Sequence, residues 1–161
     1  MMNILIIGNC GVGKTWLMSN LIKHLKADKR VKVGMIYYHS NGQVNVIGKY
    51  DGSIFQGSDR LSMAVCRDLD KYMELTKDQI NIFEGDRFTN STVINKTNPY
   101  IIRIMGSGAE GRLKRNSQQT ERHIKSIATR VSNIIPNLEV SNSTEGLNAI
   151  LNILQFKEVS K

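Results

Sequence analysis

The residues best suited to chemistry stand near the start of the chain, in the sequence Gly8-Asn9-Cys10-Gly11-Val12-Gly13-Lys14-Thr15. Their spacing is G-x-x-x-x-G-K-[ST], the Walker A or P-loop pattern. Glycines let backbone N–H groups close around phosphate oxygens, and the helix that follows adds its positive dipole end. The lysine of such a loop reaches the β- and γ-phosphates, and the hydroxyl holds Mg²⁺. We therefore expect residues 8–15 and the next residue, Trp16, to bind ATP and Mg²⁺, with Lys14 also catalytic.

The elements that must position this loop are readable around it. An apolar run over residues 3–7 predicts a buried strand, and an amphipathic pattern over residues 14–26 predicts a helix. Further strands are expected at residues 33–38, 44–47, 80–83, 100–105 and 138–140. Helices are expected within 61–75, near 92–95, across 109–135 with a possible break, and over 144–154, capped by Ser143 or Thr144. This alternation predicts one α/β domain, residues 1–161, with the three-layer P-loop NTPase fold and a mostly parallel sheet of about five strands.

A second group of reactive residues follows the predicted strand at residues 80–83, where Glu84, Asp86 and Arg87 stand. Ligands of α/β sheets collect beyond the carboxyl ends of the strands. We expect Glu84 to hold Mg²⁺ with Thr15 or to orient an acceptor hydroxyl. Asp86 and Arg87 are candidates to bind substrate, the arginine through a phosphate. The alternative is a solvated loop with an internal Asp–Arg ion pair.

A third group lies in the glycine-rich segment at residues 48–63, before the next predicted helix. Asp59 is a candidate general base for an acceptor hydroxyl, and Arg60 is a candidate electrostatic clamp. Asp51 is a second candidate base on the acceptor side. The alternative is structural, because Ser58 or Asp59 would also serve as a helix cap with Arg60 on the surface.

A basic region from about residue 106 to 130 is expected to form a lid. Gly106 and Gly108 would act as its hinge, and its arginines would neutralise charge on the transferring phosphoryl group. Arg112 and Arg115 lie three residues apart, so they share one helical face. Both are candidate catalytic residues. A solvated basic face is the alternative.

Composition narrows the class of protein. The 161-residue chain has a net charge of +8, which fits either a nucleic-acid partner or simply a phosphate-binding enzyme. No apolar run reaches the roughly 20 residues of a membrane span. The two cysteines, Cys10 and Cys66, favour a reducing cytoplasm over a disulfide framework. The tetrapeptide at residues 95–98, Asn-Lys-Thr-Asn, lacks the final carboxylate of a guanine-specific switch.

The order of these parts resembles that of small P-loop nucleoside and nucleotide kinases, over nearly the whole chain. Asp86-Arg87-Phe88 resembles the Asp-Arg-aromatic motif of thymidylate kinases, whose arginine contacts the acceptor phosphate. GKYDGSIFQGSDRLSMAV (residues 48–65) with FEGDRF (residues 83–88) is similar to a group of tailed-phage kinases that includes 5-hydroxymethyluracil DNA kinases. The resemblance implies acceptor-side roles for Asp59, Arg60, Glu84 and Arg87, lid roles for Arg112 and Arg115, and a host-cytoplasm location.

The expected function is phosphorylation, by ATP, of the hydroxymethyl group of 5-hydroxymethyluracil in DNA. One alternative is a deoxynucleoside monophosphate kinase, for which the basic charge would serve phosphate binding. A second alternative, from another class, is a nucleotide-dependent regulatory or binding protein with little transferase activity. The sequence leaves the acceptor, the general base and the oligomeric state open.

Overall fold

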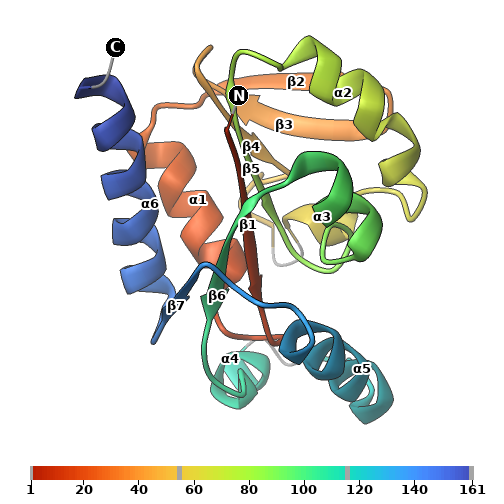
Figure 1. Ribbon diagram of the computed structural model, residues 1–161. Coiled ribbons are helices and arrows are strands. Elements are labelled where there is room, and N and C mark those ends of the chain that lie inside the picture. The colour runs from red at the N-terminus through yellow and green to blue at the C-terminus, as the bar shows by residue number, and fades with distance from the viewer. Residues whose placement is uncertain (1, 54–55, 115–116, 160–161) are drawn as a thin grey trace.

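A mixed sheet with helices on both of its faces forms the centre of the protein (Figure 1). The computed structural model describes residues 2–53, 56–114 and 117–159. The strands are β1 (Met2–Gly8), β2 (Lys29–Val33), β3 (Ile36–Ser40), β4 (Val44–Ile47), β5 (Ile80–Glu84), β6 (Tyr100–Ile104) and β7 (Leu138–Val140). The helices are α1 (Lys14–His24), α2 (Leu69–Leu75), α3 (Ser91–Thr97), α4 (Ala109–Lys114), α5 (Glu121–Ser132) and α6 (Ser143–Val159), with two 3₁₀ turns, η1 (Ser58–Arg60) and η2 (Val65–Asp68).

The sheet has seven strands in the order β2-β3-β4-β5-β1-β6-β7, so the expectation of about five strands was wrong. The five strands from β4 to β7 in this order run parallel, whereas β3 is antiparallel to both of its neighbours. Two of the seven strands, β2 and β3, come from residues 29–40, where a single strand over 33–38 was predicted. A turn at Gly34 and Met35 splits it, and the Asp68 carboxylate accepts the Met35 N–H at 2.7 Å.

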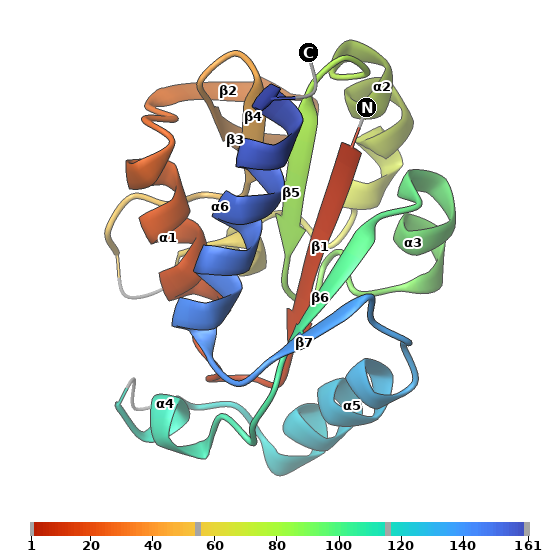
Figure 2. The ribbon, with the colours of Figure 1, turned by 60° about the vertical axis from the view of Figure 1, so that its left-hand side comes forward.

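Two apolar cores lie on opposite faces of the sheet. Ile4 and Ile6 of β1 pack with α1 and α6, whereas Leu5 and Ile7 pack with α2, α3 and α5 (Figures 1 and 2). Successive side chains of a strand point to opposite faces, so a central strand covered on both sides reads as one apolar run. This confirms an α/β protein with three layers.

A ladder of buried asparagines crosses three of the parallel strands near their amino ends. Asn45 of β4 is the register partner of Asn81 of β5, which is in turn the partner of Asn3 of β1. The Asn45 amide donates to Asn81 Oδ1 at 3.0 Å, and the Asn81 amide donates to Asn3 Oδ1 at 3.2 Å. The Tyr72 hydroxyl donates to the same Asn81 oxygen at 2.6 Å. The side-chain amide nitrogens of all three asparagines thus donate to protein atoms, whereas the buried Asn45 Oδ1 has no hydrogen-bond partner among the described residues.

The helices at the carboxyl ends of the strands differ in detail from the expected ones. The long region at residues 109–135 is broken into α4 and α5, which lie at the end of the sheet toward which β1 points (Figure 2).

The cap of α6 is Asn142, whose Oδ1 accepts the Glu145 N–H at 2.9 Å, and not Ser143 or Thr144. Glu145 in turn accepts the N–H of Ser141, the residue before the cap, so its side chain also holds the start of the helix. Within the described ranges, no helix is long and apolar enough to cross a membrane.

Candidate functional site

The loop between β1 and α1 has the backbone conformation that its glycines predict. Gly11 and Gly13 have φ values of 91° and 95°, a region in which L side chains are strained. The Lys14 ammonium folds over the loop and donates to the carbonyl oxygens of Gly8 at 2.7 Å and Asn9 at 3.0 Å. A cationic group therefore lies at the concave side of a loop that leads directly into a helix.

A cleft of about 480 Å³ opens beyond the carboxyl ends of β1 and β5. Of the predicted site residues, those that line it are Gly8, Cys10, Gly11, Gly13, Lys14, Thr15, Asp59, Glu84, Asp86 and Arg87. Its other lining residues are Gly85, Thr89, Ser117, Gln118, Gln119, His123, Ile127 and Val131. The glycine loop and the β5 end thus share one cavity, although they are about 70 residues apart in the chain.

Glu84 lies at the base of this cleft with only 3% of its surface exposed. Its Oε1 accepts the Tyr50 hydroxyl at 3.0 Å and the Ser58 N–H at 3.1 Å. Burial raises the pKa of the Glu84 carboxyl, while the nearby Lys14 ammonium opposes the rise. Burial also raises the pKa of Tyr50 well above its ordinary value, so the phenol stays a donor. Glu84 therefore connects the glycine loop with the segment at residues 48–58.

The oxygen atoms beside Gly57 suit a hard cation. A Cβ built on Gly57 would lie 2.8 Å from Glu84 Oε1 and 3.5 Å from Thr15 Oγ1, so both oxygens border one small space. Mg²⁺ is commonly held by one or two carboxylates together with substrate phosphates, and this donor set fits that pattern. In the described part of the chain, no cluster of three or more His, Cys, Asp or Glu side chains provides an all-protein cage.

Some of the charged residues that were predicted for the acceptor side form ion pairs within the protein. Arg60 forms an ion pair with Asp51 and also donates to Ser53 Oγ at 3.3 Å, so this arginine and this carboxylate hold the loop together. The bonds from Ser53 and Arg60 lower the pKa of Asp51 far below its ordinary value. Neither Asp51 nor Arg60 lines the cleft, so their predicted roles in the acceptor site are not supported by their positions.

Asp86 is also paired, but with a partner that the sequence did not suggest. Its carboxylate forms an ion pair with Arg130 of α5, and not with the adjacent Arg87. The Arg87 Nε donates to the Leu61 carbonyl oxygen at 3.4 Å, and no carboxylate of the described residues pairs with this arginine. Asp59 is exposed on η1 and borders the cleft. Asp59 and Arg87 are thus the two residues predicted for an acceptor that line the cleft without an ion pair to another described residue.

The helix α4 packs against the glycine loop itself. Arg112 donates to the carbonyl oxygens of Cys10 and Ser107, both at 2.7 Å, and the Asn9 amide donates to the Gly106 carbonyl at 2.7 Å. A Cβ on Gly111 would lie 2.0 Å from the Gly11 carbonyl oxygen, so only glycine permits this approach. Arg112 lies outside the cleft in this arrangement, and Arg115 falls outside the described residues.

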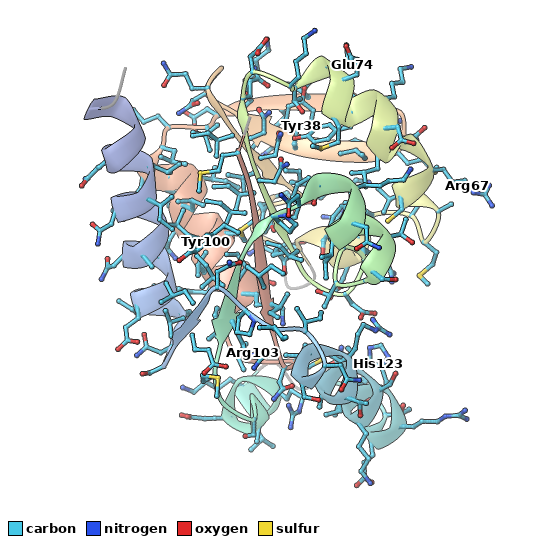
Figure 3. The ribbon with its side chains drawn as sticks, in the orientation of Figure 1. Tyr38, Arg67, Glu74, Tyr100, Arg103 and His123 are labelled. Carbon is cyan, nitrogen blue, oxygen red and sulfur yellow. The ribbon has the colours of Figure 1, made fainter. Side chains whose placement is uncertain are left out.

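The α5 wall of the cleft was not predicted. His123, Ile127 and Val131 recur every four residues, which places them on one helical face. That spacing was visible in the sequence, but the sequence prediction for this region assigned its role to the arginines and not to this face. Arg103 of β6 positions the end of α5 by donating to the carbonyls of Val131 and Ile134, and His123 lies at its other end (Figure 3).

The remaining predicted residues lie beside the cleft and do not line it. Trp16 is exposed on α1, and Val12 packs against the core under that helix. Tyr50 is buried beside the cleft with its hydroxyl on Glu84. No protein-family model matches the chain, and a search of curated proteins finds no match. The function is therefore inferred from the cleft and the residues that line it.

Proposed function

We propose that the chain is an ATP- and Mg²⁺-dependent P-loop kinase that phosphorylates the hydroxymethyl group of 5-hydroxymethyluracil in DNA. One observation carries this proposal. A single cleft is lined by Lys14 and Thr15 on one side and by Asp59 and Arg87 on the other, so groups suited to a donor and to an acceptor face the same space. Phosphoryl transfer requires little of a protein beyond positioning and charge stabilisation, which such a cleft provides.

On the donor side, the backbone N–H groups of the glycine loop would surround the phosphates of ATP. Lys14 would move from the loop carbonyls to the β- and γ-phosphates and stabilise negative charge there. Thr15 and Glu84 would hold Mg²⁺, which neutralises phosphate charge when it is bound. The glycine contacts of α4 shield one side of the loop from water.

On the acceptor side, the oxygen of the hydroxymethyl group would attack the γ-phosphorus atom. The bond between that phosphorus and the β–γ bridging oxygen breaks, ADP leaves, and the hydroxyl proton passes to the Asp59 carboxylate. Asp59 is the better base because Asp51 is ion-paired, has a lowered pKa and lies away from the cleft. Arg87 would bind an acceptor phosphate and fix the direction of attack.

DNA as the acceptor is supported by the net charge of +8 and by the resemblance of residues 48–65 and 83–88. The target base must leave the helical stack, at a cost of a few kcal/mol. A second candidate, a deoxynucleoside monophosphate kinase, is favoured by one specific feature. The unpaired Arg87 at the wall of a 480 Å³ cleft suits the phosphate of a mononucleotide, and cavities of that size hold small ligands.

The test is transfer of γ-labelled phosphate from ATP in the presence of Mg²⁺. The acceptors are a duplex with one 5-hydroxymethyluracil, the same duplex with thymine, and the free deoxynucleoside monophosphates that carry these two bases. We expect label only on the modified duplex, and no label with Lys14→Ala. Label on a free monophosphate alone would establish the second candidate instead. Nucleotide binding without label on any acceptor would favour the regulatory class.

A further inference from the structure

A second cavity, of about 290 Å³, lies on the β2–β3 hairpin at the edge of the sheet. Strand register places four of its residues on one face, since Lys32 is the partner of Tyr37 and Arg30 is the partner of His39. Lys49 and Tyr50, which follow β4, complete the wall. We call this cavity, lined by Arg30, Val31, Lys32, Tyr37, Tyr38, His39, Gly48, Lys49, Tyr50 and Asp51, the hairpin pocket.

Aromatic rings form much of the hairpin pocket. Tyr37 and His39 project from the same face of β3, and the His39 ring lies edge-on to Tyr50 with 5.9 Å between their centroids. Tyr37 is only partly buried, so part of its surface faces solvent. The Tyr38 ring instead packs edge-on against Tyr72 of α2, with 5.2 Å between their centroids. Flat aromatic surfaces of this kind accept a nucleobase, because every base has a π-face.

The charged residues of the pocket are mostly cationic and lack carboxylate partners. Lys32 Nζ and Lys49 Nζ lie 5.0 and 4.1 Å from the centre of the Tyr37 ring. Among the described residues no carboxylate forms an ion pair with either lysine or with Arg30, and the Asp51 carboxylate is bound by Arg60. The Lys32 ammonium lowers the pKa of Tyr37, which reports the positive potential at the ring. Two ammonium groups converging on one ring form a site complementary to an anion.

We propose that the hairpin pocket binds an unpaired nucleotide of a DNA strand, with its base on the partly exposed Tyr37 ring and its phosphate at Lys32, Lys49 and Arg30. The proposal rests on DNA being the acceptor in the proposed function. Tyr50 connects the two sites, because its ring lines the hairpin pocket while its hydroxyl bonds Glu84 of the cleft. Lysines on an edge strand also discourage pairing with another sheet, but that role needs no aromatic pocket.

The test is fluorescence anisotropy of a labelled twelve-residue oligothymidylate without ATP, so that binding is measured apart from catalysis. Tyr37→Leu should weaken binding at least fivefold, since stacking on an aromatic ring contributes about that much or more per base. Tyr37→Phe keeps the ring and should bind within twofold of the unchanged protein. Lys32→Ala should lower the slope of log K against log salt by about 0.7.

Lys71→Ala is the matched control, because it removes an exposed lysine from α2 on the opposite face of the sheet. Lys71→Ala should leave the affinity for the oligonucleotide unchanged. Tyr37→Leu should weaken binding by the same factor whether or not Lys71 is replaced. Equal affinity of Tyr37→Leu and the unchanged protein, or equal losses in Lys32→Ala and Lys71→Ala, would overturn the proposal. Competition by free thymidine monophosphate as strong as by the oligonucleotide would overturn the assignment to a strand. Ring-dependent binding without label transfer would refute the kinase function and leave this site standing.

Discussion

The proposed donor side and the proposed acceptor side of the cleft are built in different ways. On the donor side, eight consecutive residues form the loop, and their conformation follows from local glycine geometry. On the acceptor side, the charged residues come from η1, the β5 end and α5, and tertiary neighbours decide which of them stay available. Asp51 and Asp86 are each neutralised by an arginine that is not adjacent in sequence.

This difference shows that a charged motif is not the same as a charged site. The two Asp-Arg segments, Asp59-Arg60 and Asp86-Arg87, were predicted to bind the acceptor. One residue of each segment is neutralised by an ion pair, Arg60 by Asp51 and Asp86 by Arg130. Asp59 and Arg87 line the cleft without an ion-pair partner among the described residues, whereas Asp86, which also lines the cleft, is paired. Substitutions that separate paired from unpaired residues therefore test the comparison directly.

The largest effect is expected on the donor side, from Lys14→Ala. Removal of the ammonium should lower the transfer rate by about a thousandfold or more, because a preorganised cation at developing charge is lost. The measurement is label transfer from ATP under single-turnover conditions. Lys114→Ala is the control, since that lysine pairs with Glu110 on the exposed side of α4. A Lys14→Ala protein with the unchanged rate would remove the donor role from the loop.

Within the acceptor side, Asp59→Asn is expected to lower kcat by about a hundredfold, in the range for loss of a general base. Asp51→Asn should lower kcat by no more than about fivefold, because only an exposed ion pair is lost. Steady-state kinetics of Asp59→Asn and Asp51→Asn shows which of the two carboxylates acts as the general base. The reverse order of effects would assign the base to Asp51 and contradict the comparison.

Arg87→Ala should act mainly on acceptor binding. Loss of a charged hydrogen bond to phosphate raises KM for the acceptor by about 10- to 100-fold. Arg60→Ala, which removes the partner of Asp51, should change KM by no more than about fivefold. Equal KM values for the two variants, measured at saturating ATP, would mean that the unpaired arginine has no special role.

The smallest effect concerns stability and pH at Glu84, where the two sides meet. Its pKa is raised in the folded protein, so the folded state holds the proton more tightly than the unfolded chain. As pH rises from the ordinary value of 4.5 through the raised pKa, Glu84 therefore lowers the free energy of unfolding. Glu84→Gln keeps an acceptor for Tyr50 and Ser58 and should remove this decline between pH 4.5 and 7.

Urea unfolding at the two pH values measures this difference. Glu74→Gln, at an exposed position on α2, is the control and should keep the decline of the unchanged protein. A steeper decline in Glu84→Gln than in the unchanged protein would show that the carboxylate stabilises the fold at neutral pH.

Local signals explain what the sequence could predict. The strand at residues 3–7, the glycine loop and the helix that follows are encoded by contiguous apolar runs and spacing, and the structure has them as β1, loop and α1. The β2–β3 hairpin was missed because the Asp68 carboxylate, 33 residues away, binds its turn at Met35. The pairing of Asp86 with Arg130 spans 44 residues, so no local pattern reveals it.

The asparagine ladder at the amino ends of the strands has a consequence at the opposite end of the sheet. A slip of β5 against β1 by one residue would leave buried amides of Asn3 and Asn81 unpaired, at about 1–3 kcal/mol for each unsatisfied group. The ladder thus fixes the register of β5 relative to β1. It holds Ile6 opposite Glu84, and so fixes how far the glutamate stands from the loop that begins at Gly8. The groups proposed to hold the donor and the acceptor are thus aligned by amides that do not line the cleft.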